Sequence, residues 1–157
     1  MEERLQSKDR NNEVMPDETL IKHLDLDVTG VSAAAPLLPR QTLRVRVGEA
    51  GLKQTEKGLR RVVIPLTLEE PGRDLKGNTV QVGFRITHSF LVDESGGWSK
   101  ERGAQELLRC KMAILGIDED EAKSTPHNFD AWAGREVMAV TDVKGENQNV
   151  SRLIAIR

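Results

Sequence analysis

Positively charged side chains in the middle of the sequence have the spacing that most suggests a chemical role. Residues 42–68 read TLRVRVGEAGLKQTEKGLRRVVIPLTL, and Arg44 and Arg46 alternate with apolar residues as on the solvent face of a β-strand. Residues 41–91 carry a net charge of +4, whereas the segments before and after them each carry −3. A basic segment between acidic ones attracts polyanions locally, whatever the net charge of the chain.

The strand pattern predicts that these cations share one outer face. Apolar residues alternate with polar ones at residues 42–48, 60–69 and 79–92. With the apolar residues in the core, four arginines point outward, and two lysines lie on the connector between the first two strands. A guanidinium forms paired hydrogen bonds with phosphate, so such a face suits a nucleic-acid backbone. The candidate nucleic-acid-binding residues are Arg44, Arg46, Lys53, Lys57, Arg60, Arg61, Arg85 and Trp98. The alternative is an ordinary solvated sheet face, where arginine is also common.

Aromatic residues are scarce, which bears on how a nucleic acid would bind. The chain has three Phe, two Trp and no Tyr. Phe84 and Phe90 fall on the apolar side of the third strand, and Trp132 is expected to fill the core with Phe129. Trp98, in the loop sequence SGGWSK, is the aromatic best placed to stack on a base, with Trp132 as the lesser alternative. Binding is therefore expected to be mainly electrostatic and sensitive to salt.

No pattern in the sequence indicates an enzyme or a metal site. His23, His88 and His127 are widely spaced and form no metal-ligand motif with a cysteine or a second histidine. Cys110 falls inside a helical pattern, where a buried apolar role is expected rather than a reactive thiol. The acidic run at residues 118–121 lacks the alternation and glycine of a calcium loop. We expect no catalytic residue, metal or cofactor. A stoichiometric metal, or a pocket in which His88 meets carboxylates, would instead favour an enzyme.

The order of the predicted elements indicates a mainly β fold. Three strands precede a helix at residues 99–115 and two strands follow it, so the single helix lies between strands three and four. This order is typical of the OB-fold, a five-stranded, partly open barrel, although a split β-sandwich would use the same elements. Ser99 is placed to cap the helix and Gly116 to end it. The helical spacing predicts one apolar face, with Ile114 adjoining it, made of Ala104, Leu107, Leu108, the stem of Lys111 and Leu115. Pro65 predicts an edge or a bulge, and Gly83 a bulge or a bend.

The chain divides into a leader and one domain. Residues 1–40 are expected to form an acidic, partly flexible leader, and residues 41–157 an OB-fold-like domain. The leader sequence DETLIKHLDLDV predicts a short helix capped by Asp17, with its apolar residues on one face. The sequence has no apolar run long enough to span a membrane, no recognisable secretory signal and only one cysteine, so a cytoplasmic protein is expected.

Four segments share an order of features with one group of proteins. They read AAPLLPRQTLRVRVGEAGLKQTEKGLRRVVIPLTL, GNTVQVGFRITHSFLV, ERGAQELLRCKMAILGI and WAGREVMAVTDVKGENQNVSRLIAI. The turn and barrel positions concerned are Thr55, Lys57, Gly58, Gly77, Leu115, Gly116, Gly134, Arg135, Val137, Gly145, Glu146, Asn149 and Val150. With these, residues 33–156 resemble small tailed-phage proteins of the single-stranded DNA-binding, OB-fold type.

This resemblance implies a function and a setting. Such a protein would bind single-stranded DNA in phage DNA replication or recombination, in the host cell cytoplasm, without enzymatic activity or a cofactor. A homo-oligomer is compatible with it, and no membrane is involved. The alternative is a phage structural or assembly module that uses the same barrel for protein–protein contacts.

Overall fold

The structure, a computed structural model, describes residues 19–30 and 33–156. The chain divides into two units, Met1–Ala34 and Ala35–Arg157. In the first unit, residues 19–28 form neither helix nor strand, and their large apolar side chains are exposed. The short helix predicted here is therefore wrong over the described residues, because an isolated helix of this length lacks the packing that stabilises it. Its expected cap, Asp17, lies outside the described residues.

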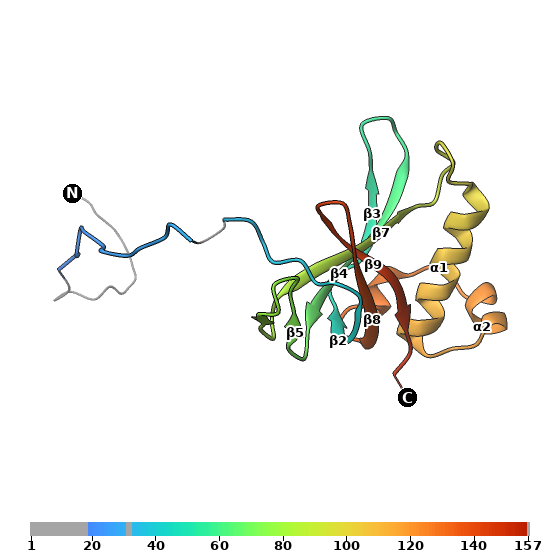
Figure 1. Ribbon diagram of the computed structural model, residues 1–157. Helices are drawn as coiled ribbons and strands as arrows, with labels where there is room; N and C mark the ends of the chain where they lie inside the picture. The colour runs from blue at the N-terminus through green and yellow to red at the C-terminus, as the bar shows by residue number, and fades with distance from the viewer. Residues whose placement is uncertain (1–18, 31–32, 157) are drawn as a thin grey trace, which may run out of the picture. The chain divides into compact units, whose positions relative to one another are not determined.

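The second unit is built on one antiparallel sheet (Figure 1). Its strands are β2 (Gln41–Val47), β3 (Gly51–Gln54), β4 (Arg60–Leu68), β7 (Arg85–Leu91), β8 (Glu136–Lys144) and β9 (Asn147–Ile154). One edge of β4 pairs with β2 and β3 and the other edge pairs with β7, while β2 pairs with β8 and β8 with β9. A separate small hairpin consists of β5 (Gly72–Arg73) and β6 (Thr79–Val80).

Pro65 accounts for the break between β2 and β3. These two short strands follow the same edge of β4 and leave a gap opposite Pro65. Proline has no N–H to donate, and its carbonyl accepts the N–H of Gly48, in the gap, at 2.8 Å. The predicted irregularity is confirmed: Pro65 is tolerated inside a paired strand because the neighbouring strand is interrupted beside it.

The third predicted strand, residues 79–92, is also interrupted. It forms β6 and β7, with a turn at Val82 and Gly83 between them, and Gly83 has a φ of +98° that favours glycine. Val82 was predicted for the core but is 54% exposed, because the turn ends the strand alternation on which that prediction rested. Phe84, just after the turn, is half-buried and packs against the core.

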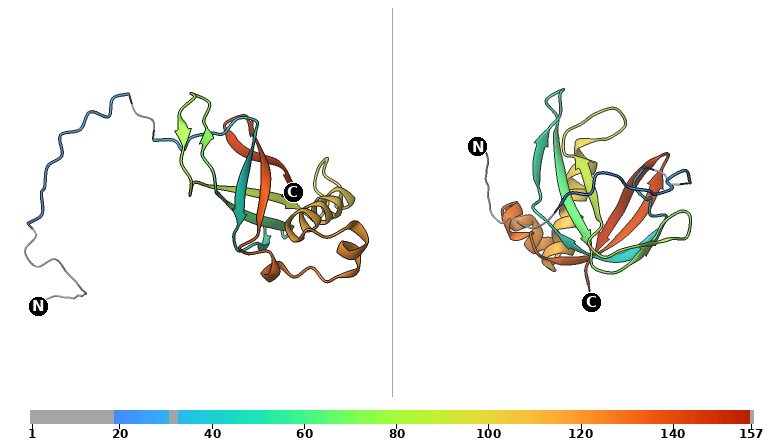
Figure 2. Two further views of the ribbon diagram at one scale, coloured as in Figure 1. Left: turned by 90° about the horizontal axis from the view of Figure 1, so that it is seen from below. Right: turned by 90° about the vertical axis from the view of Figure 1, so that its left-hand side faces the viewer.

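Two helices pack beside the sheet (Figure 1, Figure 2). α1 (Lys100–Leu115) contacts β7 and β9, and α2 (Glu119–Ser124) contacts α1. The Ser99 hydroxyl accepts the N–H of Arg102 at 3.1 Å, and Gly116 ends α1 with a φ of +67°, so both predicted caps are confirmed. A 3-10 turn, η1 (Phe129–Ala131), precedes β8.

The packing of α1 differs from the predicted packing because of Gly103. A Cβ at this position would lie 2.3 Å from the carbonyl oxygen of Leu91, so only glycine allows the helix to approach β7 this closely. The helix therefore buries Gly103, Cys110 and Ile114, whereas Ala104, expected on the apolar face, is exposed. A single small residue thus fixes which face of the helix meets the sheet.

The core lies between the sheet and α1. Its largest member is Trp132, which is fully buried and packs edge-on against Phe129 with ring centroids 4.8 Å apart, as predicted. Lys111 is also fully buried, although only its stem was expected to be. Its ammonium donates hydrogen bonds to the carbonyls of Ala122 and Thr125, both at 2.7 Å, which compensate for the buried charge and join α1 to α2.

The prediction of a mainly β fold is confirmed, since antiparallel strands predominate and helices are few. The strands β7 and β9 contact each other, but no ladder between described residues joins them, so the sheet is not closed. The pairings therefore do not establish a five-stranded barrel. Within residues 19–30 and 33–156, no helix combines the length and the apolar character needed to cross a membrane.

Candidate nucleic-acid interface

The predicted cations occupy two ends of the outer sheet face. Arg46 pairs with Thr67, which pairs with Arg85, and these three positions form one row across β2, β4 and β7. Lys53 pairs with Arg61 in a second row across β3 and β4. The rows cross β4 at Arg61 and Thr67, six positions apart, which corresponds to about 20 Å along the strand. The outward orientation agrees with the alternation in the sequence, but the cations do not form one continuous patch.

At the first end, carboxylates neutralise the arginines. Arg44 bonds Glu136 at 3.1 Å, and Arg46 bonds Glu136 at 2.6 Å and Glu69 at 2.8 Å. Glu70 accepts the backbone N–H of Arg44. We call Arg44, Arg46, Glu69 and Glu136 the acid-paired end. Its arginines are exposed but already neutralised, so they attract phosphate less strongly than free cations would.

Arg60 is neutralised in the same way, although it lies near the other end. Its guanidinium bonds both carboxylate oxygens of Asp93, at 2.7 and 3.1 Å, and its backbone N–H donates to the same group at 2.7 Å. These bonds from Arg60 lower the pKa of Asp93 from 3.8 to about 2. The pair fastens the segment after β7 to the start of β4, which is a structural role.

The second end opens into a cleft of about 550 Å³ between α1, β7 and the β8–β9 hairpin. Its lining contains four cations, Arg61, Arg102, Arg109 and Lys144, and two carboxylates, Glu106 and Asp142. Arg61 donates to the hydroxyl of Ser89 at 3.2 Å and has no ion pair within the part of the chain that the structure describes. The cleft therefore has an excess of positive charge and hydrogen-bond donors.

Trp98 forms part of the cleft wall and is held in a fixed orientation. Its indole N–H donates to the carbonyl of Leu91 at 2.7 Å. The guanidinium of Arg102 lies 4.5 Å from the centre of the Trp98 ring, in a cation–π contact. An aromatic ring is thus placed next to a cation, the combination that single-strand binders use for bases and phosphates.

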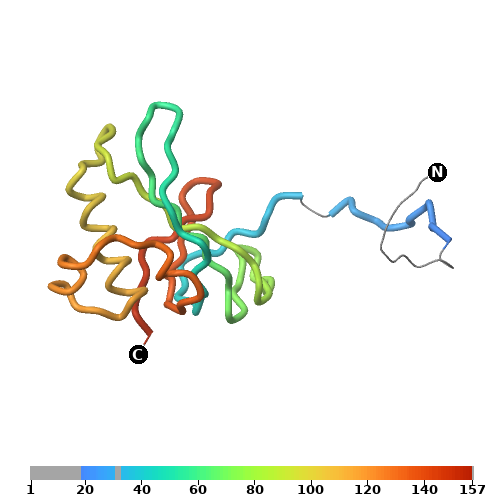
Figure 3. Tube along the Cα trace, turned by 180° about the vertical axis from the view of Figure 1, so that it is seen from behind, coloured from blue at the N-terminus to red at the C-terminus, as the bar shows by residue number. Residues whose placement is uncertain are grey.

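A second hollow continues the cleft along the sheet. It lies between the β3–β4 loop and the segment after β7, has a volume of about 380 Å³, and includes Lys57 and Ser95 in its lining. Arg61 and Leu91 line both hollows. The β3–β4 loop, the segment from β7 to α1 and the β8–β9 turn all point toward the same end of the unit (Figure 3). We call the two hollows together the basic groove.

The structure therefore divides the sequence candidates. Lys57, Arg61 and Trp98 line the basic groove, and Lys53 lies across from Arg61. Arg44, Arg46 and Arg60 are bound to carboxylates, and Arg85 lies at the far end of β7. Sequence reasoning missed Arg102, Arg109 and Lys144. Arg102 and Arg109 are seven residues apart, which places them on one helix face. This spacing was the signal in the sequence that could have indicated them.

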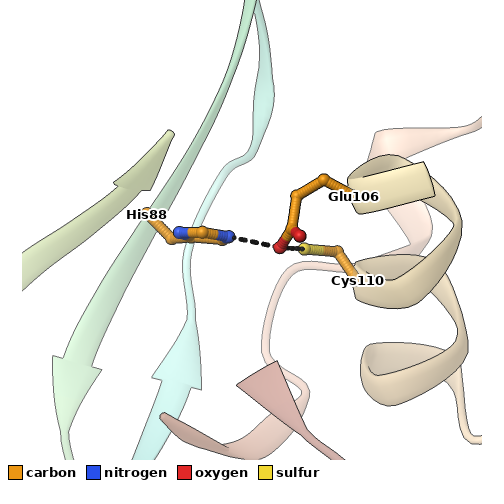
Figure 4. Close-up of side chains that lie close together, drawn as sticks. All are labelled: His88, Glu106 and Cys110. Atoms are coloured by element: carbon orange, nitrogen blue, oxygen red, sulfur yellow. Dashed lines mark hydrogen bonds and ion pairs between the residues drawn. The ribbon is translucent and has the colours of Figure 1, made fainter. Parts of the chain in front are cut away.

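The floor of the cleft holds a buried polar cluster (Figure 4). His88 Nε2 lies 2.9 Å from Glu106 Oε2, and the Cys110 thiol lies 3.6 Å from the same oxygen. The hydrogen bond with His88 lowers the pKa of Glu106. Burial, with the nearby carboxylate, raises the pKa of the Cys110 thiol, which is 1% exposed. His88 thus meets a carboxylate in a cleft, the arrangement that would favour an enzyme, whereas the raised pKa of Cys110 disfavours the thiolate form that a nucleophile requires.

Comparison with known proteins gives no family for the chain. No protein-family model matches it, and no curated protein is significantly similar to it.

Proposed function

We propose that the chain is a non-enzymatic, OB-fold-like protein that binds single-stranded DNA in the basic groove. The observation that carries the proposal is the cleft in which Arg61, Arg102, Arg109 and Lys144 gather beside Trp98. The order of elements along the chain supports the OB-like fold. A first strand interrupted into β2 and β3 is followed by β4 and β7, then by a helix, and then by the β8–β9 hairpin. OB-folds bind oligonucleotides along their second and third strands, which here correspond to β4 and β7.

The groove favours phosphate contacts over base recognition. Guanidinium and ammonium groups bind the backbone of any sequence, and a single aromatic side chain stacks on a base without reading it. Affinity is therefore modest, independent of sequence and dependent on salt. Such binding suits a protein that covers or transfers exposed strands, as in the phage replication or recombination implied by the resemblance.

The direct test is binding of the full chain to a fluorescent oligo-dT, followed by polarisation at low and at moderate salt. We expect saturable binding at low salt, a steep loss as salt rises, and weaker competition by a duplex of the same length. Replacing Arg61, Arg102 and Lys144 with alanine should abolish most of the binding. Absence of binding at low salt, or equal binding by this variant, would contradict the proposal.

A second candidate function, an assembly module, is favoured by one observation. Leu20, Ile21, Leu24, Leu26 and Val28 are large apolar side chains that are all exposed in the first unit. Exposed apolar groups in such number are typical of a segment that contacts another protein. Copurification with virions together with no affinity for oligo-dT would support this candidate instead.

A further inference from the structure

Three side chains of types that commonly bind transition metals converge at the floor of the cleft. His88 comes from β7, and Glu106 and Cys110 from successive turns of α1 (Figure 4). One donor atom from each, an imidazole nitrogen, a carboxylate oxygen and a sulfur, lies within 4.8 Å of the other two. We propose that His88, Glu106 and Cys110 form a zinc site whose fourth position opens to the cleft. This inference does not depend on DNA binding.

The distances suit a tetrahedral ion after small side-chain adjustments. Zinc bonds of about 2.0–2.3 Å place neighbouring ligand atoms about 3.3–3.6 Å apart. The Cys110–Glu106 distance of 3.6 Å already fits, and the His88–Glu106 distance of 2.9 Å has to increase by about half an ångström. The third pair, His88 and Cys110, lies within 4.8 Å and has to come to about 3.5 Å. The ion would replace the hydrogen bond between the imidazole and the carboxylate.

The three ligands lie on a helix and a strand that pack closely against each other, which suits a metal site. Glu106 and Cys110 are four residues apart on α1 and therefore point from one helix face, the spacing of paired ligands in helical zinc motifs. Gly103 holds this part of the helix close to β7, which carries His88. His88 and Glu106 also line the cleft, whereas Cys110 lies beneath it, so a water molecule from the cleft can complete the coordination.

The donor set disfavours hard cations and suits a transition metal such as zinc. Magnesium and calcium prefer oxygen ligands and do not favour a thiolate, whereas zinc accepts nitrogen, oxygen and sulfur together. Coordination requires the Cys110 proton to leave, and a neutral imidazole with one carboxylate and one thiolate balances the charge of Zn²⁺. Arg109 lies 3.7 Å from the other oxygen of Glu106, leaving Oε2 to the metal. The walls of the cleft also carry its remaining charged groups, which are Arg61, Arg102, Lys144 and Asp142.

The spacing of the histidines in the sequence predicted no metal site. The three ligands belong to a strand and a helix that are 18 residues apart at His88 and Glu106, and only the fold brings them together. No short sequence motif therefore contains all three residues of this cluster.

The test is titration of the full metal-free chain with Co²⁺, which substitutes for zinc and reports its ligands by absorption. We expect one ion per chain and a thiolate-to-cobalt charge-transfer band. Because the chain has a single cysteine, that band assigns Cys110 as a ligand without any variant. Added Zn²⁺ should displace Co²⁺ and remove the band.

Variants then separate the three ligands. Cys110→Ala should abolish the band, and His88→Gln or Glu106→Gln should weaken Zn²⁺ binding by more than the roughly 10–100-fold that outer-sphere partners contribute. The matched control is His23→Gln, which removes an exposed histidine of the first unit and should leave binding unchanged. Circular dichroism of each metal-free variant checks its folding. No stoichiometric binding by the wild-type chain, or a cobalt spectrum without the thiolate band, overturns the proposal.

Discussion

The acid-paired end and the basic groove contain the same kind of residue on the same sheet, yet their electrostatic states differ. At the acid-paired end, Arg46 is fixed by Glu69 and Glu136 within 2.8 Å. In the groove, the one side-chain hydrogen bond of Arg61 among the described residues goes to a serine hydroxyl, and Arg61 faces a hollow with further cations. Outward arginines are thus available to a polyanion only where the rest of the fold places no carboxylate within ion-pair distance. The difference is set by the neighbouring elements, not by the arginines themselves.

The largest expected effect is on stability, at the contact between α1 and β7 that forms one side of the cleft. Gly103→Ala places a methyl group 2.3 Å from the Leu91 carbonyl oxygen and 2.8 Å from the Val92 Cα, so α1 must move away from β7. We expect a loss of about 3 kcal/mol in the free energy of unfolding, as for severe overpacking. Urea unfolding measures it. The control is Gly97→Ala, whose added Cβ meets no atom within 4 Å and should cost little. Equal effects of the two changes would contradict the close packing of α1.

The second prediction compares how the acid-paired end and the basic groove contribute to oligo-dT affinity. Replacing Arg61, Arg102 and Lys144 with alanine removes three cations. The slope of the logarithm of the oligo-dT binding constant against the logarithm of salt concentration should then be about 2 less steep, which corresponds to about 100-fold weaker binding at 0.1 M salt. The matched variant replaces Arg44, Arg46 and Arg60 and removes the same charge. Because these arginines are bound to carboxylates, we expect it to change affinity by less than about twofold at that salt. Similar losses in both variants would show that net charge alone governs binding.

A smaller effect is expected at Trp98. Trp98→Ala removes the only aromatic ring in contact with Arg102 among the described residues, and should weaken oligo-dT binding by about tenfold if a base stacks there. Trp98→Phe keeps a ring but loses the hydrogen bond to Leu91, and should keep most of the affinity. Polarisation assays measure both. Equal losses would assign the effect to the hydrogen bond and not to stacking.

The smallest effect concerns acid stability at the Arg60–Asp93 pair. The pKa of Asp93 falls from 3.8 to about 2 in the folded chain, so the unfolded chain binds the proton first as pH decreases. The stabilisation is complete above about pH 5 and is lost as pH falls from there through the folded pKa of about 2. Urea unfolding of wild type and Asp93→Asn at several pH values should show a stability difference that shrinks over this range. A constant difference would exclude the ionised pair as its cause.

The sequence predicts the orientation of the cations well because strand alternation is local. Arg44, Arg46 and Arg61 each lie one residue from a buried apolar side chain, and the structure places them outward accordingly. Their partners are not local. Glu136 meets Arg46 across the β2–β8 pairing, 90 residues away, and this register has no signature in either segment. Charge counted along the chain therefore overstates the free positive charge of the middle segment.

Other parts of the site depend on packing that no periodicity shows. The helix at residues 99–115 and both of its caps were predictable, but its rotation was not, since Gly103 meets β7 where an ordinary apolar stripe was expected. That rotation decides which helix residues face the cleft, including Arg102, Arg109 and Glu106. The interruption at Gly83 similarly changed the long third strand into a turn and a shorter strand.

The buried thiol at the cleft floor makes local opening of the chain measurable. Cys110 is the only cysteine and is 1% exposed on the buried side of α1, so an alkylating reagent reaches it only when the helix separates from the sheet. The rate of alkylation under native conditions therefore reports how often this region opens, and its denaturant dependence distinguishes a local event from global unfolding. The Cys110 thiol of the wild-type chain is thus a kinetic probe of opening at the place where the groove, α1 and the sheet meet.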